Sequence, residues 1–250
     1  MKTLPVCFLT TVLCLGCRYS SNTQPAPPTG EDKPSGENEG NPKEILAALQ
    51  QLGTAFHDFE SSHRVLPAAV VLGKDGKSLL SWRVAILPQI KEAGLYQQFK
   101  LDEPWDSEHN KMLLPKMPKV YAPLRGPAPK EPHSTYYQVF TGPDAPFNLT
   151  SRLGPRITDF TDGTAQTFLI VEASEAVPWT KPADLVYDVK KPLPKLGFGD
   201  RVYLVLADGS SHFIKKTVSE PIFRAAITPN GNEREVLFTD ERWVLDEGRP

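Results

Sequence analysis

The most regular hydrophobic pattern in the chain predicts a helix of about twenty residues that begins at Pro42. Five apolar residues recur at steps of four and three, on one face of this helix: Ile45, Leu49, Leu52, Phe56 and Phe59. Asn41 can cap the helix, Pro42 suits its first turn, and Glu44 is placed to complete a capping box. His57 lies beside the apolar face, and we interpret it as structural. We expect this face to pack in the core.

Shorter patterns predict small helices and strands after this helix. Residues 68–72 and 77–80 flank a Gly-Lys-Asp-Gly turn and predict a hairpin. Short helices are predicted over 82–87, 89–99, 108–114 and 220–226. Further strands are predicted over 136–141, 167–173, 201–207 and 212–215. Beyond the first helix the chain thus mixes short helices and strands.

Proline is unusually abundant in this chain. It accounts for 25 of 250 residues, about twice the usual ~5%. Because proline cannot continue a helix interior, we expect many Pro-rich loops and only short helices after the first. The net charge of −2 excludes a strongly basic surface, so we expect no nucleic-acid partner.

The first seventeen residues indicate export. Lys2 precedes an apolar run over 4–15 that is short for a membrane span. The run ends in Leu13-Cys14-Leu15-Gly16-Cys17, which resembles a bacterial lipobox with Cys14 in the place of the usual leucine. This resemblance implies cleavage before Cys17 and lipid attachment to its thiol. The alternative is an ordinary secretory signal peptide with incidental cysteines.

The chain therefore divides into three predicted parts. Residues 1–16 form a lipoprotein signal peptide, 17–41 a lipid-anchored flexible linker rich in Pro, Gly and polar residues, and 42–250 a single domain. A loop packed on the domain is the alternative for the linker. After cleavage Cys17 is the sole cysteine, so we expect no disulfides. Because Arg18 stands where an aspartate often retains lipoproteins in the inner membrane, we expect outer-membrane anchoring.

Several segments of the domain resemble a large bacterial family of unknown function, catalogued under a solute-binding label. Many of its members look like type II secretion G-type pseudopilins. The likeness rests on 52–59 with Leu66-Pro67-Ala68, on 81–88, 99–107, 157–164, 171–173 and 177–182, and on Ala207-Asp208-Gly209-Ser210. The resemblance implies the α+β fold class, a pilin-like head with the first helix packed across an antiparallel sheet, and no established activity. Because a lipobox and linker stand where pilins carry an apolar half-helix, we do not expect filament assembly.

Motifs for catalysis are lacking in the sequence. The five histidines are scattered, with no H-E-x-x-H spacing, and neither a nucleophile elbow nor a Walker sequence occurs. We therefore expect no catalytic residues and no enzymatic activity.

An acidic turn around Asp159 and Asp162 is a candidate calcium site, with Glu172 and Glu175 downstream. Calcium prefers several carboxylate and carbonyl oxygens, and the resemblance implies a calcium-binding loop, since G-type pseudopilins carry one in the head. The alternative is a structural turn, because Asp162-Gly163 is a turn sequence. We favour the turn and expect neither a metal nor another cofactor.

Trp105 and Trp179, each after a proline, are candidate binding residues. Exposed tryptophans could bind a sugar or a protein; the alternative, which we favour, is that both anchor loops to the core. We interpret the protein as a non-enzymatic, lipid-anchored extracytoplasmic protein that contacts the membrane through its anchor and an envelope protein through its head. The alternatives are a solute- or glycan-binding lipoprotein and a hydrolase.

Overall fold

The computed structural model describes residues 39–231, 236–239 and 242–245, and the side chains of 39–231. The predicted signal peptide 1–16, the acceptor Cys17 and the linker as far as residue 38 lie outside the described residues. No helix in the part described has the length and apolar character needed to cross a membrane.

The long helix α1 spans Pro42–His63, as predicted. Asn41 caps it through Oδ1, which accepts a hydrogen bond from Lys43 N at 3.1 Å, while Asn41 Nδ2 donates to Glu44 Oε1. The predicted apolar face is buried as far as Phe56, and Phe59 is half-buried. The helix ends where Arg64 adopts a left-handed conformation, with φ of 63°. Local capping and periodicity thus suffice to define this element.

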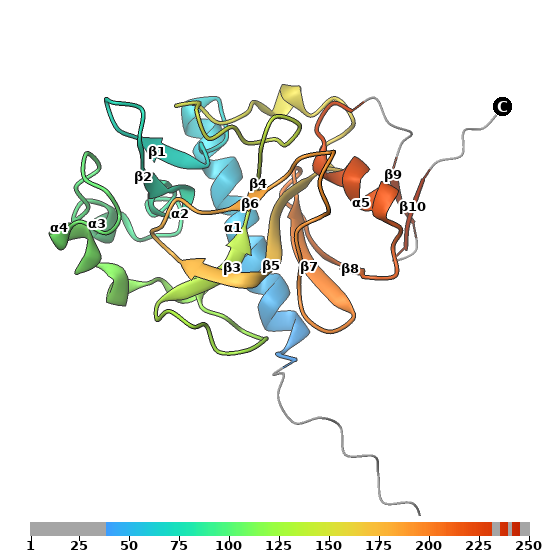
Figure 1. The fold of residues 1–250 in the computed structure, drawn as a ribbon, viewed down its shortest axis with the longest axis horizontal. Coiled ribbons are helices and arrows are strands. Elements are labelled where there is room, and N and C mark those ends of the chain that lie inside the picture. The colour runs from blue at the N-terminus through green and yellow to red at the C-terminus, as the bar shows by residue number, and fades with distance from the viewer. Residues whose placement is uncertain (1–38, 232–235, 240–241, 246–250) are drawn as a thin grey trace, which may run out of the picture. The chain divides into compact units, whose positions relative to one another are not determined.

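A four-stranded antiparallel sheet crosses α1, in the order β3-β5-β7-β8 (Figure 1). Its strands are β3 (Ser134–Gln138), β5 (Phe168–Pro178), β7 (Arg201–Leu206) and β8 (Ser211–Lys215). The strands β7 and β8 form a hairpin in which Arg201 lies opposite Lys215. The predicted α+β class, with a helix on an antiparallel sheet, is confirmed.

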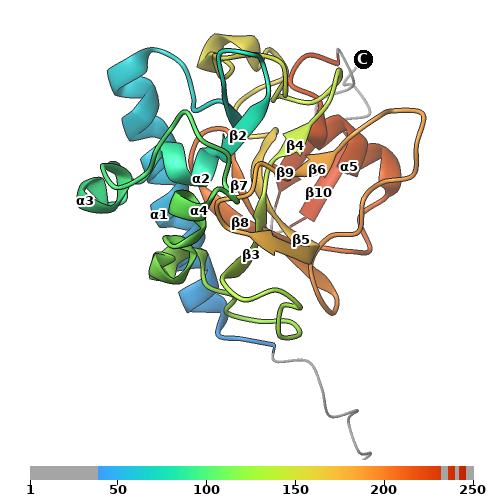
Figure 2. The same ribbon diagram turned by 60° about the vertical axis from the view of Figure 1, so that its left-hand side comes forward.

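Both faces of the sheet are covered. Tyr203 and Val205 of β7 join the core beneath α1, whereas Val202 and Leu204 join a second core beneath α5 (Glu220–Ile227). Figure 2 shows α1 and α5 on opposite sides of the sheet. Burial on both faces explains why β7 is a continuous apolar run rather than an alternating one.

Short elements pack beside the sheet. They are β1 (Val70–Leu72), β2 (Ser78–Ser81), α2 (Trp82–Ala85), α3 (Ala93–Tyr96), α4 (Glu108–Lys111), η1 (Leu114–Lys116), η2 (Lys119–Tyr121) and η3 (Ile157–Asp159). The predicted hairpin is present as β1 and β2. The helix predicted over 89–99 is reduced to the single turn α3, because Lys91 has a left-handed φ of 67° that interrupts it.

The strand predicted over 136–141 is divided in two. Beyond β3, the short strand β4 (Phe140–Thr141) pairs in parallel with β6 (Leu185–Val186). The sequence analysis did not predict β6, nor the hairpin of β9 (Val236–Thr239) and β10 (Arg242–Leu245). Two residues of β6 are too few for an alternating pattern to indicate a strand.

Candidate functional site

Trp179 is an anchor of the core. Its side chain is 0% exposed, its Nε1 donates to the Leu114 carbonyl at 3.0 Å, and its ring stacks on Tyr121. Because the ring has no exposed face and its N–H already has an acceptor, Trp179 offers nothing to a ligand. This is the loop-anchoring arrangement that we favoured for it from the sequence.

Trp105 is half-buried and packs against the same core. Its backbone N–H donates to Leu79 O at 2.8 Å, and the Lys181 ammonium lies 5.4 Å from its ring centroid. With Trp179 inside the core, an aromatic groove formed by both tryptophans is not present.

The acidic turn uses its carboxylates to hold the backbone. Asp159 Oδ2 accepts from Arg156 N, and Asp162 Oδ2 accepts from Gly231 N, each at 2.7 Å. Glu172, expected nearby, instead lies on β5 against Arg125. Among the described residues, no three His, Cys, Asp or Glu side chains are grouped as a metal site.

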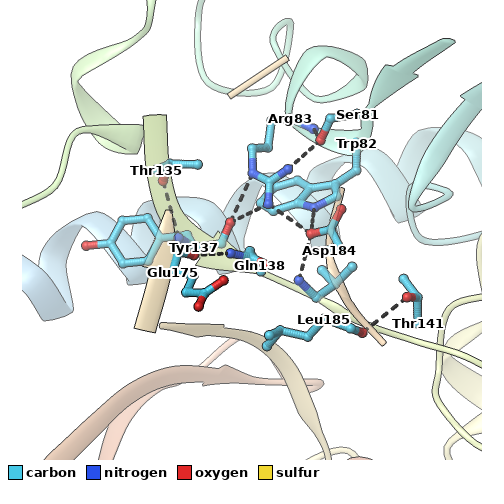
Figure 3. Close-up of polar contacts among 11 residues, drawn as sticks. Ser81, Trp82, Arg83, Thr135, Tyr137, Gln138, Thr141, Glu175, Asp184 and Leu185 are labelled. Carbon is cyan, nitrogen blue, oxygen red and sulfur yellow. Dashed lines mark hydrogen bonds and ion pairs between the residues drawn. The ribbon is translucent and has the colours of Figure 1, made fainter. Parts of the chain in front are cut away.

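The most concentrated polar cluster surrounds Arg83 and Asp184, whose side chains are both fully buried (Figure 3). Arg83 Nη2 lies 2.8 Å from Asp184 Oδ1, and Nη1 donates to Ser81 Oγ at 2.7 Å. Asp184 Oδ1 also accepts from Trp82 Nε1 at 3.1 Å. The Arg83 guanidinium lies over the Trp82 ring, 4.6 Å from its centroid.

This cluster completes the hydrogen bonding of a sheet edge. Arg83 Nε and Nη2 donate to Tyr137 O at 3.0 and 2.6 Å, and Asp184 Oδ1 accepts from Val139 N at 3.0 Å. In a parallel ladder, one residue of the neighbouring strand would bond to such a carbonyl and N–H. The parallel pairing begins one step further on, where Leu185 N donates to Val139 O at 3.1 Å. Arg83 and Asp184 therefore extend the β4–β6 ladder with side chains.

Burial governs the protonation of Asp184. It raises the pKa of this carboxyl, while Arg83 and the hydrogen bonds to the carboxylate oppose the rise. Asp184 Oδ2 has no hydrogen-bond partner among the described residues. The Asp184 side chain is closed to solvent, and its hydrogen bonds connect Trp82, Arg83 and Val139.

A second buried ion pair joins Arg125 to Glu172. Arg125 Nε lies 2.9 and 3.0 Å from the two carboxylate oxygens, and Nη2 lies 2.8 Å from Oε2. Arg125 Nη2 also donates to the carbonyls of Phe198 and Arg201, each at 2.8 Å. Burial raises the pKa of the Glu172 carboxyl against the opposing effect of Arg125. This pair fixes the loop between residues 197 and 201 onto the sheet.

Sequence reasoning did not identify these pairs as sites. Arg83 lies within an apolar stretch over 79–87, and Glu172 within the apolar strand β5. A charge inside an apolar run can indicate a buried partner. Asp184 has no such context, and it is 101 residues from Arg83 in sequence, so its role could not be predicted locally.

A pocket of about 560 Å³ lies beside Arg125. Its walls are Glu39, Gly40, Pro42, Arg125, Phe198, Gly199, Asp200, Arg201 and Tyr203. The cations in it are already engaged: Arg125 holds Glu172, and the Arg201 guanidinium lies 4.7 Å from the Phe213 ring centroid. Arg201 Nε also lies 3.7 Å from Asp200 Oδ1, so both guanidinium groups in this pocket have acidic partners among the described residues.

Residues 47–190, more than half of the chain, match the model of the family SBP_bac_10, described as protein of unknown function (DUF1559). The match runs from α1 into the segment after β6 and includes both members of each buried ion pair. No curated protein and no solved structure matches the chain.

Proposed function

The chain belongs to the DUF1559 family of proteins of unknown function, and from its own residues we propose that it is a non-enzymatic, lipid-anchored protein of the cell envelope. In this proposal Cys17 carries the lipid, residues 18–41 act as a tether, and the head contacts another envelope protein. The helix α1 packed across the sheet supports a pilin-like head, and the lipobox with its spacer supports display of this head rather than polymerisation.

The observation that carries the proposal is the order of three parts along the chain: the acceptor sequence ending in Gly16-Cys17, a polar spacer, and a folded head that begins at Pro42. Fully extended, a spacer of this length would reach on the order of 80 Å. Such a reach suits a head that must meet a partner away from the membrane surface.

The two buried ion pairs inside the head support a non-enzymatic role. Arg83 with Asp184 and Arg125 with Glu172 bond mainly to each other and to backbone carbonyls and N–H groups. A general acid or base must reach a substrate proton within hydrogen-bond distance. These buried carboxylates hold structure in our proposal.

The outer side of β6 is the surface that we propose for contact with a partner. Val186 of β6 is 63% exposed, Val189 in the segment that follows is 51% exposed, and β6 pairs with β4 alone among the described strands. Exposed apolar side chains beside the unpaired edge of a strand are suited to protein contact.

The anchor is tested by replacing Cys17 with Ser and, as a matched control, Cys7 with Ser, since Cys7 lies in the apolar run outside the lipobox. We expect the parent and the Cys7→Ser protein to incorporate labelled palmitate and to sediment with membranes, because both keep the acceptor thiol. The Cys17→Ser protein should incorporate no palmitate, and it should either leave the membrane fraction or stall with its signal peptide uncleaved. Equal labelling of all three proteins would contradict lipid attachment at Cys17.

The contact surface is tested by placing a photo-crosslinking residue at Val186 in cells, with Lys74 as the control position. Lys74 lies exposed in the turn between β1 and β2. A discrete crosslinked species from position 186 and none from position 74 is expected. The same products from both positions would count against a specific contact at β6.

A further inference from the structure

A second pocket, of about 410 Å³, lies on the α5 side of the sheet. Apolar groups form most of its wall, among them Leu196 from the loop before β7, Val202 of β7 and Phe223 of α5. Val218 lies in the same wall and is partly exposed. The pocket thus has an apolar interior that is continuous with the second core.

The charge of this pocket is positive. Lys195 and Lys216 both line it and are both exposed. The carboxylate on the described wall is Glu220, and it is neutralised by Arg224, whose Nη2 lies 2.6 Å from Glu220 Oε1. The two lysines are therefore not balanced by a free carboxylate of the described wall.

Both lysine ammonium groups have N–H donors that are not used within the described residues. Lys216 Nζ donates to Gly197 O at 3.1 Å, and an ammonium group has three donors. The Lys195 ammonium makes no hydrogen bond or ion pair with any of the described residues. This distinguishes the pocket from the one beside Arg125, where the guanidinium groups are engaged.

We propose that this pocket binds a small carboxylate with an apolar body, such as a fatty or aromatic acid. Its volume lies within the roughly 300–1,000 Å³ of small-molecule pockets. The apolar body would cover Leu196, Val202 and Phe223, while the carboxylate would accept hydrogen bonds from Lys195 and Lys216. This inference goes beyond the proposed function, and it depends neither on the lipid anchor nor on the β6 surface.

The test uses calorimetric titration of the mature chain, residues 17–250, with Cys17 replaced by Ser, because this protein carries neither the apolar signal run nor the proposed lipid acceptor and so needs no detergent. Decanoate and 1-decanol are compared because they share an apolar chain and differ in the carboxylate. We expect saturable one-to-one binding of decanoate, about tenfold or more tighter than that of decanol, because charge-assisted hydrogen bonds contribute to it alone.

Variants locate the binding. Replacing Lys195 and Lys216 together with Gln should remove the preference for decanoate and leave decanol binding unchanged. Val218→Trp should abolish both by filling the pocket. Lys215→Gln is the matched control, since Lys215 is exposed on β8 and does not line the pocket; it should bind as the parent does.

Melting curves of each variant confirm that it is folded before binding is compared. Absence of saturable decanoate binding to the parent would overturn the proposal. So would an unchanged preference in the double lysine variant, or undiminished binding by folded Val218→Trp, because each would place binding outside this pocket.

Discussion

The guanidinium of Arg83 lies 2.8 Å from the carboxylate of Asp184, and together these side chains occupy the outer edge of β3. They bond to Tyr137 O and Val139 N as a neighbouring strand would. Each residue of the pair therefore neutralises the charge of the other, and each also forms a hydrogen bond with a backbone group at the edge of the sheet.

Asp184→Asn should destabilise the head by about 3–5 kcal/mol, because it leaves the buried Arg83 charge without its counter-ion. Chemical unfolding of the two proteins measures the difference. Asp75→Asn is the control, since Asp75 pairs with Lys77 at the surface, and its melting temperature should match the parent. Replacing both buried residues, Arg83→Met with Asp184→Leu, should not restore stability, because Tyr137 O and Val139 N would lose their partners. A double variant as stable as the parent would contradict the edge-pairing role.

Stability should fall as pH rises through the pKa of Glu172. Burial raises the pKa of this carboxyl above its ordinary value of 4.5, so the folded state keeps the proton to higher pH than the unfolded chain does. The stabilisation is complete below 4.5 and is lost as pH rises through the folded-state pKa. Urea unfolding from below this value up to neutrality measures the slope.

Glu172→Gln isolates this effect, because it cannot ionise. Exposed carboxyls with a lowered pKa, such as those of Asp75 and Asp188, contribute the opposite slope, but they are present in both proteins. The parent should lose stability relative to the Gln variant as pH rises. Parallel curves for the two proteins would show that Glu172 titrates alike in the folded and unfolded states.

Two helical glycines should respond in opposite directions to replacement by Ala. A Cβ at Gly53 in α1 would clash with Gly209 O and would lie 2.8 Å from Val205 Cγ1, so Gly53→Ala should cost about 1–3 kcal/mol by overpacking. A Cβ at Gly94 in α3 would meet nothing within 4 Å. Gly94→Ala should stabilise by about 0.4–1 kcal/mol. Thermal melts test both, and a stabilising Gly53→Ala would show that α1 does not approach the β7–β8 turn this closely.

Calcium should leave the melting temperature unchanged, because Asp162 Oδ2 already accepts from Gly231 N. A calcium ion that bound the native state alone, at a hundredfold excess over its dissociation constant, would add about 2.7 kcal/mol. Asp162→Ala should lower the melting temperature equally in calcium and in chelator, because the acceptor for Gly231 is lost. A calcium-dependent rise in the parent that disappears in Asp162→Ala would instead establish an ion site at this turn.

The sequence predicted those helices and strands that are determined by nearby residues, such as helix caps, apolar periodicity and turns. The cap at Asn41 and the apolar stripe defined α1, and the Gly-rich turn after residue 72 defined the first hairpin. The strands β5 and β7 were also found, because each contains an apolar run, and β8 was found because an Asp-Gly turn joins it to β7. Where backbone conformation interrupts a pattern, as at Lys91, the sequence overestimated helix length.

The polar interior could not be predicted in the same way. Arg125 and Glu172 are 47 residues apart, and they meet because the loop before β3 returns across β5 and β7. The pocket near Lys216 likewise combines residues from β5, β7 and α5 with the loop between them. Such contacts depend on tertiary topology, which a single sequence does not encode in any short pattern.

The edge formed by Arg83 and Asp184 bears on how copies of this protein behave together. If the heads are tethered to one membrane, they meet at a high local concentration, and an open strand edge would invite one sheet to add to the next and begin aggregation. Because the Tyr137 carbonyl and the Val139 N–H are already bonded within the molecule, these two backbone groups are not open to a neighbouring strand. The buried charges thus protect this edge from pairing with a second copy.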